Sequence, residues 1–295
     1  MLYWMRLGLY GVAHPSKVTK TLRNLWRTRN AEAFVVSYPK TGRTWLRVMI
    51  GQFLAGRIGK GQDVLLDTYA ITELAGVKKT LFTHDGPFLL FSGAPYNELA
   101  FNESSYRGRD VVFIIRDIRD TLVSSYFQES QRMHTYSGSI SDFLRDDVFG
   151  VRRIVTFYNL WYQNRALPRS FLLARYEDMH ADPVAVLAEV VKALGVADAS
   201  PEALQQAVAY ASFDNMKKME TSGVFRDPMM QPGKAGSGES FKVRRGKIGG
   251  YTDYMGPEDL AYVQQVVEEM ALPGCDWYFA PQPEAAGAAK RSATD

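Results

Sequence analysis

The sequence predicts an α/β protein in which helices flank a central parallel sheet. Short apolar runs that suit buried strands are followed by segments in which apolar residues recur at helical spacing. This alternation is typical of a parallel sheet covered on both faces. The composition agrees, because 46% of the 295 residues are hydrophobic and 23% are charged, as in ordinary globular proteins. By length, the chain fits one large domain or two small ones.

Residues 1–30 form a basic N-terminal segment. Met1–His14 is apolar but interrupted by Arg6, and it is shorter than the ~20 residues that span a bilayer. It also lacks the basic n-region and clear cleavage site of a signal peptide. Basic and apolar residues then alternate up to Arg29. This pattern predicts an amphipathic helix packed on the domain, with a weak membrane-surface contact as the alternative.

The first strand and the first helix of the domain are joined by a short loop. Ala33–Ser37 is an apolar run that suits a buried parallel strand. From Thr44 onward, apolar residues return at helical spacing. We therefore expect residues 38–42 to connect a strand to a helix N-terminus.

The same arrangement is repeated downstream. Val111–Ile115 predicts a second strand, Asp117–Gln128 the helix after it, and Phe171–Ala174 a third strand. Ser200 and Pro201 resemble an N-cap and the first residue of a helix. Further helices are expected at residues 151–164, 184–194 and 257–270.

Two segments are expected to lie outside this regular pattern. Residues 231–250 contain six glycines, several basic residues and few apolar ones, which predicts a lid or binding loop. Residues 280–295 are rich in Ala and Pro, and we expect a disordered tail. The intervening residues 31–279 form the predicted domain.

Charge and cysteine content narrow the class of partner. The chain has 35 Lys and Arg against 32 Asp and Glu, an excess too small to indicate a nucleic-acid partner. Cys275 is the single cysteine, so no intrachain disulfide forms, and no residues near it have metal-ligand spacing. A reducing compartment, the cytoplasm, is therefore predicted.

The most informative segment is the loop at residues 38–45, Tyr-Pro-Lys-Thr-Gly-Arg-Thr-Trp. Successive backbone N–H groups at a helix N-terminus bind phosphate, and Lys40 and Arg43 add positive charge. A Walker A loop has Gly where this chain has Ser37, and Lys where it has Arg43. The loop is therefore predicted to bind phosphate but differs from that of a kinase.

The segment at residues 38–45 resembles the 5'-phosphosulfate motif of the cytosolic sulfotransferases, and the chain is identified as a bacterial-looking member of this PAPS-dependent family. PAPS is 3'-phosphoadenosine 5'-phosphosulfate, and its product PAP is adenosine 3',5'-bisphosphate. The resemblance spans residues 34–251 and implies a single domain with the P-loop-like sulfotransferase fold. It also implies that the donor is bound by Lys40, Thr41, Gly42, Arg43, Thr44 and Trp45.

Two further motifs resemble the family's 3'-phosphate site. The strand that ends in Arg116, with Ser124 two helical turns later, is similar to the first of them. Arg offers planar, bidentate recognition of phosphate, and the Ser hydroxyl can add a hydrogen bond. Arg244, Arg245 and Gly246 resemble the second motif, R-K-G-x-x-G. The resemblance also implies that Tyr176 lies near the adenosine and that Phe213 and Trp45 enclose the adenine.

His84 resembles the family's catalytic base, and histidine is competent to accept a proton near neutral pH. The sequence departs from the family at two places here: Phe82 stands where the family has an active-site lysine, and Asp85-Gly86 adds a residue before the following proline. Either Lys78 or Lys79 substitutes for that lysine, or Lys40 alone stabilises the leaving group.

The sequence therefore predicts transfer of a sulfuryl group from PAPS to a hydroxyl or amine of a small-molecule, carbohydrate or lipid acceptor. His84 and Lys40 are the expected catalytic residues. No metal is expected, because the strand that would carry a metal-binding Asp ends in Arg116. The alternatives are an ATP-dependent kinase with an atypical phosphate loop and a noncatalytic nucleotide- or membrane-binding module. The acceptor and the oligomeric state stay open.

Overall fold

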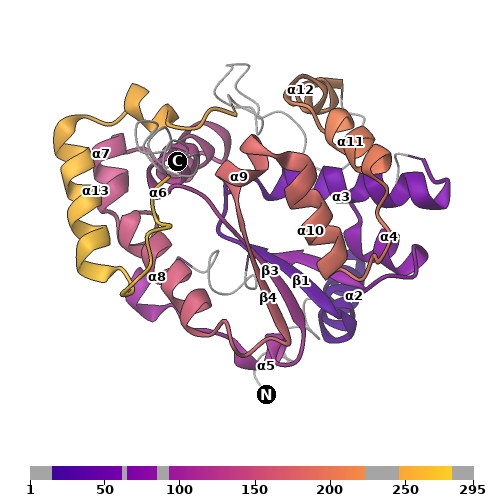
Figure 1. The fold of residues 1–295 in the computed structure, drawn as a ribbon. Coiled ribbons are helices and arrows are strands. Elements are labelled where there is room, and N and C mark those ends of the chain that lie inside the picture. The colour runs from indigo at the N-terminus through magenta and orange to yellow at the C-terminus, as the bar shows by residue number, and fades with distance from the viewer. Residues whose placement is uncertain (1–14, 62–64, 85–92, 223–245, 281–295) are drawn as a thin grey trace, which may run out of the picture.

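The computed structural model describes residues 15–61, 65–84, 93–222 and 246–280 (Figure 1). In this part of the chain, four strands form one sheet in the order β2-β1-β3-β4. All neighbouring strands are parallel, so their carboxyl ends lie at one edge of the sheet. The strands are β1 (Ala33–Ser37), β2 (Thr80–Thr83), β3 (Asp110–Ile115) and β4 (Ser170–Arg175). The predicted α/β class and parallel sheet are confirmed.

Helices lie on both sides of this sheet. The α-helices are α2 (Pro15–Asn30), α3 (Arg43–Ile58), α4 (Thr68–Leu74), α5 (Glu103–Tyr106), α6 (Ile118–Phe127), α7 (Ile140–Arg145), α8 (Val151–Gln163), α9 (Tyr176–Ala181), α10 (Pro183–Ala193), α11 (Pro201–Tyr210), α12 (Phe213–Ser222) and α13 (Pro257–Met270). Short 3₁₀ turns η2 (Tyr96–Glu98) and η6 (Gly250–Asp253) and a π-helical turn η3 (Gln128–Arg132) complete the described elements.

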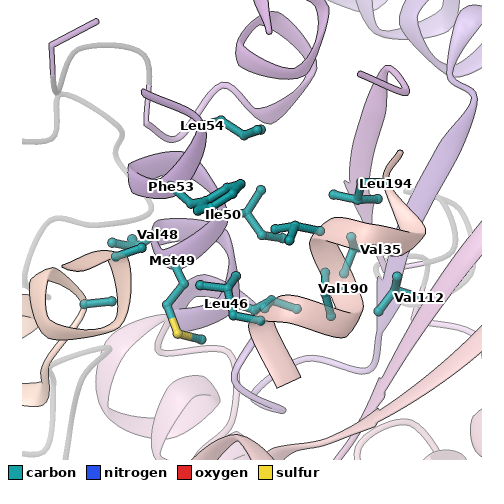
Figure 2. Close-up of a cluster of buried hydrophobic side chains, with 14 of the residues drawn as sticks. Val35, Leu46, Val48, Met49, Ile50, Phe53, Leu54, Val112, Val190 and Leu194 are labelled. Carbon is teal, nitrogen blue, oxygen red and sulfur yellow. The ribbon is translucent and has the colours of Figure 1, made fainter. Parts of the chain in front are cut away.

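The alternating side chains of the strands divide the core into two layers. Val35 and Val112 face a cluster built with α3, α10 and α11, and Figure 2 shows Ile50 and Val190 directed toward these strand residues. The residues that alternate with them along the strands, such as Phe34, face the opposite cluster, which is formed with α6, α8 and α13. Burying a side chain of this size stabilises the fold by about 1.5–3 kcal/mol. The two layers hold the strand ends in fixed positions.

Most element predictions agree with the structure to within a residue or two. The first strand and the helix at residues 257–270 have the predicted bounds, and Ser200 caps α11 by accepting a hydrogen bond from the backbone N–H of Ala203 at 3.1 Å. Strand β2 is not predicted, because a four-residue edge strand with two threonines shows too little apolar periodicity. Its partner β1 precedes it by 47 residues, and no local pattern encodes such a pairing.

An ion cluster closes the amino end of the sheet at Asp110, the first residue of β3. This carboxylate pairs with Lys78 Nζ at 2.7 Å, accepts from Arg169 Nε at 2.9 Å and from Ser170 Oγ at 2.7 Å, and is 3% exposed. Burial by itself would raise the pKa of Asp110, but hydrogen bonds from Arg169, Lys78 and Ser170 outweigh it and hold this pKa well below its usual range. Lys78 therefore stabilises the amino end of the sheet by pairing with Asp110.

Helix α2 is the described part of the basic N-terminal segment. The Arg27 guanidinium makes two hydrogen bonds of 3.0 Å to the carboxylate of Asp67 and lies 5.0 Å from the ring centroid of Tyr69. No helix among the described residues is long and apolar enough to cross a bilayer. The predicted tail, apart from Ala280, and residues 231–245 of the predicted lid lie outside the described residues.

Candidate active site

The loop at residues 38–42, called the phosphate loop after its predicted role, connects the carboxyl end of β1 to the N-terminus of α3, as predicted. Lys40 and Gly42 adopt left-handed conformations with φ of 71° and 91°. Glycine is required at position 42 for a second reason, since a Cβ there would lie 2.4 Å from Cδ2 of Tyr176. The loop therefore turns sharply and lies directly against the tyrosine ring.

A buried side chain holds the loop in its conformation. The Thr41 hydroxyl is fully buried and donates to the carbonyl oxygen of Tyr38 at 2.9 Å, so this side chain fixes the turn. Among the described residues, no side chain caps α3 at Gly42. The backbone N–H groups at this terminus, with Arg43 and Thr44 in the first turn, form a site suited to an anion.

Lys40 reaches the end of α6 from this loop. Its Nζ lies 3.3 Å from Oε1 of Gln128, the first residue of the π-helical turn η3. Such turns often mark functional sites. Gln128 was not predicted from the sequence, because a lone glutamine at a helix end carries no motif.

Arg116 connects three segments of the chain at the carboxyl end of β3. Its Nη1 donates to the Lys40 carbonyl oxygen at 3.2 Å, and its Nη2 donates to the Lys247 carbonyl oxygen at the same distance. The guanidinium carbon lies 4.3 Å from the Tyr176 ring centroid. Only 11% of the side chain is exposed, and Nε is a buried donor with no partner among the described residues. The guanidinium therefore lies between the phosphate loop and the segment that begins at Gly246.

Asp120 is a site residue that the sequence prediction missed. Its carboxylate accepts from the backbone N–H groups of Gly249 at 2.8 Å and Tyr251 at 3.0 Å, and it lies 3.6 Å from Nη2 of Arg116. Burial raises the pKa of Asp120. Its position one helical turn after Arg116 is a signal that could have identified it. Asp120 fixes the end of the glycine-rich segment beside Arg116.

Ser124 follows Asp120 by one further turn of α6 and is half-buried. Residues four apart share a face of a helix, so Ser124 lies on the same face as Asp120. The neighbouring pair Asp117 and Arg119 has a different role: Arg119 Nη2 and Asp117 Oδ2 are 2.6 Å apart, and the guanidinium lies over the rings of Tyr251 and Phe279. Of the two arginines, only Arg116 is turned toward the phosphate loop.

Aromatic side chains line the other side of the loop. The ring centroids of Trp45 and Tyr176 are 6.0 Å apart, and Trp45 Nε1 donates to the carbonyl oxygen of Ala211 at 2.9 Å. Phe213 is 39% exposed and touches Gly246, where a Cβ would lie 2.9 Å from its ring. The structure thus brings the predicted residues Trp45, Tyr176, Phe213 and Gly246 to one region. Arg244 and Arg245 lie outside the described residues.

His180 is a further neighbour that the sequence prediction did not select. Its ring centroid lies 5.0 Å from that of Trp45, and its Nε2 lies 3.0 Å from the Tyr176 hydroxyl. Burial and, second, the charge of Arg116 lower the pKa of His180. Both effects favour the neutral form of the ring, which can hydrogen-bond the tyrosine without adding charge.

His84 directly follows β2 at the carboxyl edge of the sheet. Its Nδ1 lies 2.7 Å from the carbonyl oxygen of Ser37, the last residue of β1. A carbonyl oxygen can only accept a hydrogen bond, so Nδ1 carries the proton. In the neutral ring the lone pair then resides on Nε2, the tautomer that a general base requires. The contact also fixes His84 next to the start of the phosphate loop.

Phe82 packs in the core layer of α3, and the guanidinium carbon of Arg47 lies 4.7 Å from its ring centroid. Lys78 and Lys79 precede β2 and lie at the amino end of the sheet, where Lys78 pairs with Asp110. Both lysines therefore lie at the opposite end of the sheet from the loop at residues 38–42. Of Lys40, Lys78 and Lys79, only Lys40 lies at the carboxyl edge of the sheet.

A family profile described as "Sulfotransferase domain" matches residues 30–273. Cytosolic sulfotransferase 17 of Arabidopsis thaliana is 25% identical, and the match covers 90% of this chain and 80% of that protein. Sulfotransferase 2A2 of Mus musculus is 22% identical, with coverage of 72% and 75%.

Two solved structures have a similar fold. A mouse sulfotransferase complexed with PAP has a TM-score of 0.57 and 20% identity, with 84% of this chain and 86% of that chain covered. Retinol dehydratase in complex with androsterone and inactive cofactor PAP has a TM-score of 0.56 and 18% identity, with 85% and 82% covered.

Proposed function

The chain belongs to the sulfotransferase domain family, and from this premise we propose that it transfers the sulfuryl group of PAPS to a hydroxyl or amine of an acceptor. The observation that carries the proposal is the position of Arg116, which hydrogen-bonds both the phosphate loop and the segment at Lys247. A donor with phosphate groups at two ends needs two such segments side by side. The complexes of structural relatives with PAP support the same donor.

Each end of the donor has its own set of residues in this proposal. The 5'-phosphosulfate lies at the N-terminus of α3, bound by the backbone of residues 41–45 and the side chains of Lys40 and Arg43. The 3'-phosphate is bound by Arg116, Ser124, Arg244, Arg245 and the backbone of Gly246. The Nε of Arg116 has no hydrogen-bond partner among the described residues, which supports this assignment because an arginine carries five N–H donors that a phosphate can accept from. Trp45, Tyr176 and Phe213 contact the adenosine.

Transfer proceeds by one in-line displacement. His84 Nε2 accepts the proton of the acceptor hydroxyl, and the acceptor oxygen forms a bond to sulfur. The bond between sulfur and the bridging 5'-phosphate oxygen breaks, and PAP leaves with that bond's electron pair. Lys40 and the loop amides stabilise the negative charge on the departing oxygen. Positioning and electrostatics carry most of the catalysis, as in phosphoryl transfer.

The acceptor is proposed to be a small molecule, carbohydrate or lipid. Retinol dehydratase, a structural relative, is described in complexes with androsterone and with retinol, which supports a small-molecule acceptor. Cytosolic sulfotransferases 17 and 16 of Arabidopsis thaliana are relatives of this chain, and we propose a cytoplasmic location for this chain as well.

Isothermal titration calorimetry with PAP, AMP and ATP tests the donor assignment. A charge-assisted phosphate contact contributes about 1.5–3 kcal/mol, so PAP should bind roughly ten- to hundredfold more tightly than AMP, which lacks the 3'-phosphate. Incubation with sulfur-labelled PAPS and an acceptor panel then identifies the substrate. Equal affinity for the three nucleotides would overturn the proposal, and tight PAP binding without transfer to any acceptor would favour a noncatalytic module.

A further inference from the structure

Helix α2 carries a concentration of positive charge that the proposed reaction does not use. Its 16 residues contain five basic side chains and no acidic one, namely Lys17, Lys20, Arg23, Arg27 and Arg29. Three large apolar side chains of the same helix are exposed: Leu22 at 49%, Leu25 at 46% and Trp26 at 55%. Single exposed apolar residues are ordinary on a protein surface, but three on one helix turn require an explanation.

The exposed apolar residues lie on one side of α2. Leu22, Leu25 and Trp26 are spaced i, i+3 and i+4, so they share a face of the helix. Arg27 is directed to the domain, where it pairs with Asp67. The Trp26 ring centroid lies 5.9 Å from that of Tyr69, yet this side chain stays 55% exposed. The helix is thus attached by one side, while Leu22, Leu25, part of Trp26 and the side chains of Arg23 and Arg29 are exposed.

We propose that α2 binds the surface of an anionic lipid bilayer. Leu22, Leu25 and Trp26 enter the interface between headgroups and acyl chains, while Arg23 and Arg29 contact the lipid phosphates. Long basic side chains suit this position, because their apolar stems cover apolar surface while their charged ends stay hydrated. The 14 residues before α2, Met1–His14, are mostly apolar and include Trp4, so the chain that leads into the helix has a composition suited to the same interface.

The charge of α2 favours a bilayer over a second copy of the chain. A symmetric dimer through this face would oppose two helices that each carry five positive and no negative side chains, and like charges across an interface disfavour association. An anionic membrane supplies the complementary charge over an extended area.

The position of α2 separates membrane contact from catalysis. The end of the helix is fixed to the amino end of the sheet, where Arg109 donates to the carbonyl oxygens of Arg29, at 2.9 Å, and Ala31. The phosphate loop follows the opposite, carboxyl end of β1. In Figure 1, α2 lies beside the start of β1, and α9 and α12 lie toward the other end of the molecule. A lipid surface bound by α2 therefore leaves the donor site accessible.

Co-sedimentation of the full-length protein with sucrose-loaded vesicles tests this proposal. We expect binding to phosphatidylcholine vesicles that contain phosphatidylserine, at least tenfold weaker binding to phosphatidylcholine alone, and release as the salt concentration rises. Trp26→Ser and the double variant Arg23→Glu/Arg29→Glu should each lower binding several-fold. Met133→Ser is the matched control, because Met133 is also 55% exposed but follows η3 at the carboxyl side of the sheet; it should bind as wild type does.

PAP calorimetry on each variant verifies that the fold and the donor site are intact. Binding that is independent of phosphatidylserine, or that is unchanged in the α2 variants, would overturn the proposal. So would the absence of sedimentation, or a dimer in analytical ultracentrifugation that Trp26→Ser dissociates. Loss of PAP binding in a wild-type chain that still binds vesicles would instead contradict only the proposed reaction.

Discussion

Replacement of Arg116 by alanine is the sharpest test of the donor site. The substitution removes a guanidinium that lies between Lys40 and Lys247. This group makes two hydrogen bonds of 3.2 Å to backbone carbonyls, and its buried Nε has no hydrogen-bond partner among the described residues. Loss of one charge-assisted contact to the 3'-phosphate costs about 1.5–3 kcal/mol, so the Kd for PAP should rise roughly ten- to hundredfold. Arg116→Lys keeps the charge but loses the planar, bidentate guanidinium, so its Kd for PAP should lie between those of the wild type and Arg116→Ala.

The neighbouring Arg119 supplies a matched control. It stands three residues away, but its guanidinium pairs with Asp117 and lies over Tyr251 and Phe279. Arg119→Ala should therefore alter thermal stability without a comparable change in PAP affinity.

Calorimetry with PAP on all three variants, with thermal unfolding measured in parallel, separates binding from folding. Because Arg116→Ala leaves the buried Asp120 without its nearby cation, some loss of stability is expected in that variant too. A folded Arg116→Ala variant that binds PAP within twofold of wild type would refute the role assigned to this residue. Equal losses of affinity in the Arg116 and Arg119 variants would do the same.

Three further predictions concern the base, the loop and the amino end of the sheet. His84→Ala should lower single-turnover transfer from labelled PAPS by about 10²–10⁴-fold, the usual contribution of a general base, while PAP binding and the His134→Ala control stay near wild type; an active His84→Ala variant would contradict the mechanism. Gly42→Ala should destabilise the fold by at least about 1 kcal/mol and weaken PAP binding, since the new Cβ would collide with Tyr176. Gly59→Ala imposes a similar left-handed strain, but its new Cβ meets no atom of the described residues within 4 Å. Unfolding and PAP titration of the two variants therefore separate backbone strain from steric contact. Asp110→Asn should lower the free energy of unfolding by about 1.5–3 kcal/mol at pH 7. Because the folded-state pKa of Asp110 lies below its unfolded value, the stabilisation is present above pH ~4 and is lost as the pH falls further. Urea titrations across this range should show the two proteins converging, and a difference that stays constant with pH would contradict the ion cluster.

The order of strands and helices could be predicted because each signal is contained in a short stretch of chain. Ala33–Ser37 is apolar throughout, the loop follows at once, and the helix after it repeats apolar residues at helical spacing. Backbone geometry alone then places the loop N–H groups at a helix N-terminus. Arg116 likewise follows an apolar run, so its position at the carboxyl end of a strand could be predicted from the sequence. The same reasoning missed β2, whose four residues pair with a strand remote in sequence.

Contacts between remote segments were decided by the tertiary structure. Asp120 bonds the backbone of Gly249 across a separation of 129 residues, and Arg116 reaches Lys247 across 131. The local sequence does not predict that Lys78 pairs with Asp110 at the amino end of the sheet. The tautomer of His84 also depends on a neighbouring strand, because the carbonyl of Ser37 accepts its Nδ1 proton.

The sequence by itself therefore determined the α/β class, the phosphate loop and the family resemblance. Each of these signals lies in short continuous segments whose backbone conformation depends on near neighbours. Only the fold decided which of the candidate side chains meet. Strand order and the packing of α6, α9 and η6 bring groups together that are separated by many residues, and the hydrogen bonds that fix Arg116 and His84 exist only once those surfaces are in contact.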